Sequence, residues 1–222
     1  MRHSLATLTA MKPIKSVLNR YILFYKPYGV LSQFTPEHGH KTLKDFGPFP
    51  PDVYPVGRLD LDSEGLLFLT DDNKIKQRAS NPNFEHPKTY WVQVENIPDA
   101  EALRRLQTGV VIEGKKTKPA GVRLLENEPD LPARSVPIRF RKNIPTAWLE
   151  ITLREGRNRQ IRKMTAAVGH PTLRLVRVKF GELTLDGLQV GESRPMTEGE
   201  ISVLQKLLKI LETRSKTHKK RI

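Results

Sequence analysis

Short apolar segments separated by proline and glycine constrain the fold of this 222-residue chain most strongly, since it contains 17 Pro and 14 Gly. Such segments favour strands joined by short turns, and strands joined in this way pair antiparallel. We therefore expect an α+β protein built on a largely antiparallel mixed sheet with flanking helices. Strand patterns lie at 21–25, 53–56, 66–70, 89–97, 109–125 (two strands around Gly114), 137–142, 147–154 and 172–180.

Helical patterns are fewer, and several begin with a residue suited to capping. Asp72 precedes a helix expected at 73–80, which Pro82 follows. The segment 157–168 is closed by Gly169 and Pro171, which commonly follow a helix. An acid- and proline-rich segment at 127–137 is the expected surface loop. The remaining helices are expected at 42–46, 99–108 and 198–211.

Composition narrows the class of protein. A hydrophobic fraction of 37% indicates a folded chain, and the absence of cysteine excludes disulfides and thiolate metal sites. No apolar run approaches the roughly 20 residues that span a bilayer, and residues 1–20 lack the apolar core of a signal peptide. We expect a cytoplasmic protein without a membrane partner.

The chain has a net charge of +14, and the excess of basic over acidic residues is concentrated in three segments. Residues 1–20 and 214–222 are basic without a single acid, and we expect both to be flexible. Residues 154–179 carry eight Lys and Arg against Glu155 alone, which leaves the rest of the chain slightly acidic. A basic segment inside the folded part indicates a dedicated surface for a polyanion such as RNA.

An acid-rich loop at 57–65 precedes the strand at 66–70, and it contains Asp60, Asp62 and Glu64. Three interpretations are open from the residues alone: the acids solvate a tight turn, bind calcium, or include one catalytic carboxylate. Asp60, directly after Arg58-Leu59, is the best catalytic candidate, and Asp62 and Glu64 are expected to point outward or brace the loop. Calcium is disfavoured because Asp71 stands where an EF-hand has Glu and the flanks are strand-like. Acids two residues apart are also poorly placed for the ~5–9 Å separation of a glycosidase.

Four motifs in order resemble the RsuA-type pseudouridine synthase family. They are Lys-Pro-Tyr-Gly at 26–29, Gly-Arg-Leu-Asp with Ser-Glu-Gly-Leu-Leu at 57–67, Lys-x-Tyr at 88–90, and Glu-Gly-Arg-Asn-Arg-Gln-Ile-Arg-Lys-Met at 155–164. The resemblance extends from about residue 21 to residue 200. It implies the pseudouridine synthase fold, with a central RNA-binding cleft between two lobes.

The resemblance also implies a reaction: a uridine already in RNA is flipped out, its N1 bond to the sugar breaks, and the sugar rejoins at C5. The catalytic residues would be Asp60, Tyr90 and Arg162, with Arg162 forming an ion pair with Asp60. Asp60 could add to the ring, attack the sugar or remove a sugar proton, and the residues do not decide among these. The reaction requires no metal and no redox cofactor. RNA would be bound by Arg58, Arg157, Asn158, Arg159 and Lys163.

Within the family the chain most resembles members that act on large-subunit ribosomal RNA. We expect a catalytic domain at 21–213 without the S4 domain that precedes it in most relatives, and a monomer. A non-catalytic factor that binds ribosomal RNA during ribosome assembly is the alternative.

Overall fold

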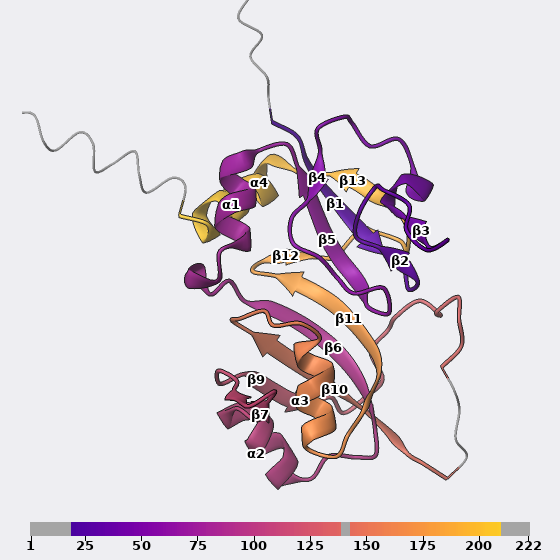
Figure 1. Cartoon of the computed structure of the whole chain (residues 1–222), viewed down its shortest axis with the longest axis vertical. Helices are drawn as coiled ribbons and strands as arrows, with labels where there is room; N and C mark the ends of the chain where they lie inside the picture. The colour runs from indigo at the N-terminus through magenta and orange to yellow at the C-terminus, as the bar shows by residue number, and fades with distance from the viewer. Residues whose placement is uncertain (1–18, 139–142, 210–222) are drawn as a thin grey trace, which may run out of the picture.

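The computed structural model describes residues 19–138 and 143–209, which form a long mixed sheet flanked by helices (Figure 1). The strand order is β13-β1-β5-β11-β6-β10-β9, with β4 and β12 attached to β5 and β11. All pairs in this nine-stranded sheet are antiparallel except β5 with β11, so the expected largely antiparallel α+β fold is confirmed. Its strands are β1 (Tyr21–Lys26), β4 (Tyr54–Pro55), β5 (Glu64–Thr70), β6 (Lys88–Glu95), β9 (Gly121–Leu124), β10 (Thr146–Leu153), β11 (Thr172–Phe180), β12 (Leu183–Thr184) and β13 (Ser193–Pro195).

The other elements are small strand pairs and helices. The strand pairs are β2 (Val30–Leu31) with β3 (Lys41–Thr42) and β7 (Val111–Ile112) with β8 (Lys115–Lys116). The helices are α1 (Asn73–Ser80), α2 (Ala100–Thr108), α3 (Gln160–Ala167) and α4 (Glu198–Leu207), with 3₁₀ turns η1 (Leu43–Phe46) and η2 (Pro82–Phe84). Asp72 caps α1 as predicted, because its carboxylate accepts hydrogen bonds from the main-chain N–H groups of Lys74 and Ile75.

Three local expectations need correction. Residues 109–125 form three strands instead of two, because the β7–β8 hairpin turns at Glu113-Gly114 and β9 follows. A strand was expected at 137–142. Residues 137–138 are not in a strand, and residues 139–142 lie outside the described residues. Helix α3 begins at Gln160 instead of residue 157, because Arg159 adopts a left-handed conformation with φ of 51°. Most of the two basic end segments likewise lies outside the described residues.

Strand β5 lies at the centre of one half of the sheet, and all seven of its residues are buried. Its side chains alternate between two cores: Leu66 and Phe68 belong to the core that includes residues of α1 and α4, and Leu67 belongs to the core that includes Leu43 of η1. A third core joins β6 and β10 to α2 and α3, in the lower half of Figure 1. Within the described residues, no helix combines the length and apolarity required to cross a membrane.

The parallel contact between β5 and β11 joins the two halves and depends on Gly65. Gly65 lies opposite Arg177 and has a φ of +109°. A Cβ atom on Gly65 would lie 2.3 Å from the main-chain oxygen of Arg177, so only glycine permits this approach. The acid-rich loop is thereby held directly beside β11.

Candidate active site

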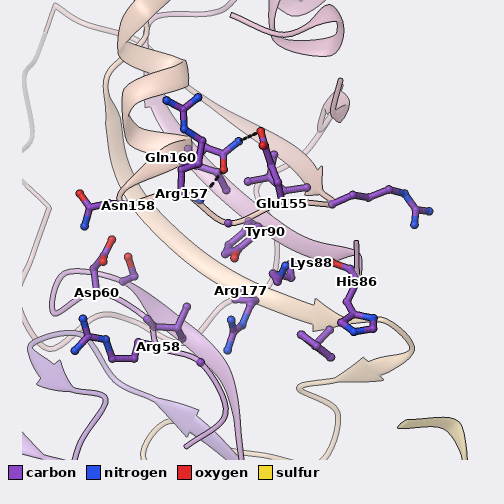
Figure 2. Close-up of a pocket in the computed structure, with 18 of the residues that line it drawn as sticks. Arg58, Asp60, His86, Lys88, Tyr90, Glu155, Arg157, Asn158, Gln160 and Arg177 are labelled. Carbon is purple, nitrogen blue, oxygen red and sulfur yellow. Dashed lines mark hydrogen bonds between the residues drawn. The ribbon is translucent and has the colours of Figure 1, made fainter. Parts of the chain in front are cut away.

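A cavity of about 400 Å³ lies where the acid-rich loop meets β6, β11 and the segment before α3. Figure 2 shows Asp60 and Arg58 on one side of it, Arg157 and Asn158 on another, and Tyr90 between them. The cavity thus brings together the aspartate, the tyrosine and part of the basic segment that the sequence predicted. It is open to solvent, so an unstacked nucleotide could enter it.

Main-chain contacts fix the position of Asp60. The Ser32 hydroxyl donates to the main-chain oxygen of Leu59 and accepts from its N–H, at 2.8 and 3.0 Å. The main-chain N–H of Ser63 donates to the oxygen of Asp60 at 3.0 Å, which closes the turn. The Asp60 carboxylate itself is 36% exposed, with Arg159 Nη1 3.7 Å away. Asp60 is therefore held on a rigid turn with its carboxylate accessible to a ligand.

The expected ion pair between Arg162 and Asp60 is not what the structure contains. Arg162 lies on Asp62 instead: Nε is 3.3 Å from its carboxylate, and Nη2 donates to its main-chain oxygen at 2.6 Å. Arg159 donates two hydrogen bonds to the same carboxylate, at 2.9 and 2.7 Å. Although burial alone would raise the pKa of Asp62, the Arg159 hydrogen bonds and the Arg162 charge lower it below its usual value. Arg162 does not line the cavity, and the carboxylate that it contacts is that of Asp62.

Glu64 also braces the loop, as expected, but from inside the protein. Arg174 donates to its two carboxylate oxygens at 2.9 and 2.8 Å, and both side chains are almost fully buried. Because Asp62 and Glu64 are both engaged by arginines, the acid-rich loop does not present a calcium site. Only Asp60 of the three acids remains available to a ligand.

The predicted RNA-binding residues divide into exposed and engaged groups. Arg58 and Asn158 are exposed and line the cavity. Arg157 also lines it, but its guanidinium donates to the main-chain oxygens of Ile112 and Lys115 at 2.8 and 3.1 Å. Lys163 lies outside the cavity with Nζ 2.6 Å from a Glu113 carboxylate oxygen. Arg157 and Lys163 thus hold the β7–β8 hairpin against the basic segment. The sequence did not predict this contact.

The segment before α3 is ordered by Gln160, whose side chain is buried. Its amide oxygen accepts from the main-chain N–H of Arg157 at 3.0 Å, and its amide nitrogen donates to Glu155 at 2.5 Å (Figure 2). These bonds and the left-handed turn at Arg159 order the segment, from which Arg159 reaches the acid-rich loop and Arg157 reaches the β7–β8 hairpin. Glu155, Arg157 and Gln160 of the motif at 155–164 therefore stabilise the local structure of this segment.

Lys26 begins the first of the four motifs, but the sequence predicted no role for it in the site. It is fully buried beneath the acid-rich loop, and its Nζ donates to the main-chain oxygens of Ser63 and Pro27 at 2.7 and 2.9 Å. Burial lowers the pKa of Lys26 to about 7, although the nearby acids Glu64, Asp62 and Asp60 oppose that shift. The sequence feature that could have indicated a role for Lys26 is its place at the end of an apolar strand, where a lysine is rarely found.

Lys88 and Arg177 are two further cavity residues without a predicted role. Lys88 precedes Tyr90 by two residues in β6, so the alternation of a strand puts both on one face. Arg177 pairs with Tyr90 across the β6–β11 ladder. Apolar and basic residues do not alternate regularly in β11, and its ladder with β6 carries register shifts, so the structure decides which way Arg177 faces.

Comparison with known proteins identifies relatives over most of the chain. A family model described as RNA pseudouridylate synthase matches residues 20–167. Ribosomal large subunit pseudouridine synthase E of Xanthomonas axonopodis pv. citri (strain 306) is 56% identical over 169 residues, covering 75% of this chain and 88% of that protein. The enzyme of the same name from Vibrio parahaemolyticus serotype O3:K6 (strain RIMD 2210633) is 50% identical over 82% of this chain and 76% of its own length. A crystal structure of a pseudouridylate synthase superposes with a TM-score of 0.70 at 29% identity, covering 84% of this chain and 74% of that one.

Proposed function

Because the chain belongs to the RNA pseudouridylate synthase family, as its motifs predicted, we propose that it isomerises a uridine of large-subunit (23S) ribosomal RNA to pseudouridine. The Xanthomonas and Vibrio relatives, both named for the large ribosomal subunit, support this choice of RNA, and the chain spans three quarters or more of each. The observation that carries the proposal is the accessible Asp60 carboxylate in one cavity with Tyr90.

We assign the chemistry to three side chains. Asp60 acts as the ionised carboxylate: it adds to the ring, attacks the sugar or removes a sugar proton, and the proposal does not choose among these three roles. Tyr90 offers a flat ring on which uracil can stack and a hydroxyl that can assist removal of the C5 proton. Arg162 is a positioning residue, because its bonds to Asp62 hold the turn from which Asp60 projects.

RNA binding is assigned mainly to the cations at the cavity mouth. Arg58 and Arg159 are exposed there and are suited to phosphates near the flipped nucleotide. Asn158 adds a neutral hydrogen-bonding group beside them. Arg157 and Lys163 contribute positive charge while they hold the hairpin, so their loss would affect both binding and local structure. We further propose that the protein acts in the cytoplasm as a monomer, with residues 21–213 as the catalytic domain.

Mapping pseudouridine in unmodified 23S ribosomal RNA after incubation with the protein tests the proposal. Wild type is expected to modify a defined uridine, and Asp60→Asn to form no product while it binds the RNA with similar affinity. Asp52→Asn is the matched control, because Asp52 is an exposed turn residue that does not line the cavity. Product from Asp60→Asn would overturn the role of Asp60. Binding without product on ribosomal RNA would favour the assembly-factor alternative.

A further inference from the structure

Lys88 and Arg177 form a pair of cations on the cavity wall next to Tyr90. The antiparallel register of β6 and β11 sets Arg177 opposite Tyr90, and Lys88 lies on the same face of β6 two residues earlier. Figure 2 shows all three side chains in the interior of the cavity, away from Asn158 at its edge. Two neighbouring strands therefore bring two positive charges to the surface on which a base would stack.

Neither cation has a carboxylate partner among the described residues. Arg177 is only 5% exposed, and its Nε donates to the main-chain oxygen of Leu66 at 2.7 Å. Lys88 Nζ donates to the main-chain oxygen of His86 at 3.2 Å. Burial and the charge of Arg177 lower the pKa of Lys88 to about 8, with Glu155 opposing. A buried arginine and a partly buried lysine without an acid are costly to the protein, which indicates that the cavity is built for a ligand carrying negative charge.

We propose that Lys88 and Arg177 bind the carbonyl edge of the target uracil and stabilise the negative charge that the base acquires during the reaction. When the N1–C1′ bond breaks, its electron pair stays with the base and spreads over the ring and its carbonyl oxygens. C1′ then bonds to C5, C5 loses its proton and N1 gains one, so the product is an isomer of the substrate. Cations held on the wall of the cavity before the reaction begins are well suited to stabilise such charge.

The position of the pair favours the base over an RNA phosphate. Phosphates keep much of their hydration and lie along the outside of a flipped nucleotide, where Arg58 is exposed and Arg159 is exposed beside its Asp62 partner. Lys88 and Arg177 lie in the interior beside Tyr90, where the edge of a stacked base would reach them. This assignment rests on the proposed function, and the experiments below distinguish a failure of the assignment from a failure of the proposed function.

Single-turnover kinetics of Lys88→Met, with RNA affinity measured in parallel, tests the proposal. The variant removes the charge and keeps an apolar stem, and we expect the rate of pseudouridine formation to fall about 100-fold with the Kd for RNA nearly unchanged. Lys88→Arg, which keeps the charge, should recover a large part of the rate. Lys206→Met, which changes an exposed lysine of α4, should match wild type.

Substrate analogues supply a second measurement. RNA with 2-thiouridine or 4-thiouridine at the target position replaces a carbonyl oxygen with sulfur, a weaker acceptor. If Lys88 or Arg177 contacts the replaced oxygen, sulfur should lower the rate of pseudouridine formation by wild type. It should have little further effect on the rate of the variant that lacks that contact, Lys88→Met or Arg177→Gln, because effects at one shared contact are not additive.

The outcomes distinguish this inference from the proposed function. An inactive wild type would reject the proposed function itself. An active wild type with a Lys88→Met variant of equal single-turnover rate would reject only the role of the cation pair. Weaker RNA binding and a shallower salt dependence at an unchanged rate would also reject it, because that pattern identifies a phosphate contact.

Discussion

Arg162 donates a hydrogen bond to the main-chain oxygen of Asp62 at 2.6 Å, and Arg159 donates two hydrogen bonds to the Asp62 carboxylate. Asp62 thereby occupies Arg162, which the family resemblance implied for Asp60, and it also occupies Arg159, which was expected to bind RNA. The Asp60 carboxylate is left with a single looser contact, Arg159 Nη1 at 3.7 Å. This division leaves one carboxylate accessible and uses its neighbour to fix the turn.

Replacing Arg162 with Lys should lower the single-turnover rate about 100-fold, the cost of a small misplacement of catalytic groups. The charge stays, but no ammonium group can reach the Asp62 main-chain oxygen, its carboxylate and the Thr172 oxygen together. Asp62→Asn should give a related loss, because both arginines lose their anion. Near-normal turnover of Arg162→Lys, measured on ribosomal RNA, would contradict the positioning role.

Removing Arg174 should strongly destabilise the fold. Arg174→Met leaves Glu64 buried without its partner, which is expected to cost about 3–5 kcal/mol of the free energy of unfolding. Adding Glu64→Gln should recover part of that loss, because no buried charge is then unpaired. Urea denaturation measures both. Arg104→Met, which breaks the exposed pair with Glu101, should leave the midpoint nearly unchanged.

The free energy of unfolding should rise with pH because of Lys26. Its pKa is about 7 in the folded protein against an ordinary 10.5, so the unfolded state binds more protons between these values. Stability attributable to Lys26 therefore increases from about pH 7 upward, by at most ~1.4 kcal/mol per pH unit. Denaturation at pH 7, 8 and 9 should show a shallower slope for Lys26→Met than for wild type. Lys88 shifts in the same direction, so some slope should persist. An equal slope in wild type and Lys26→Met would refute the assignment.

Gly65→Ala should destabilise the junction of the two sheet halves by about 2 kcal/mol or more. The new Cβ would lie 2.3 Å from the Arg177 main-chain oxygen, and the φ of +109° disfavours any side chain. Gly199→Ala is the control: Gly199 lies in α4 with space around it, and alanine there should stabilise by about 0.5–1 kcal/mol. Thermal or urea denaturation distinguishes the two, and equal effects would argue against a special constraint at Gly65.

Deleting residues 214–222 should weaken RNA binding mainly at low salt, because this segment carries five Lys and Arg and no acid. Binding should then depend less steeply on salt concentration than in the full chain, since fewer counterions are released. Titrations at several salt concentrations measure the slope. An unchanged slope would exclude a role for this segment in binding.

Much of this protein was determined by its sequence alone. Alternating and apolar patterns located β1, β5, β6, β10 and β11, and Asp72 marked the start of α1, because strand alternation, turns and helix caps depend on neighbouring residues. Motif order was sufficient to predict the family, and it selected Asp60 and Tyr90, which share one cavity. Tertiary structure decided which arginine meets which acid, since Arg159 and Arg162 contact Asp62 across 97 and 100 residues. It also decided that Lys88 and Arg177 face that cavity. These contacts depend on how closely β5 approaches β11 and on the turn at Arg159, and no local pattern encodes such long-range geometry.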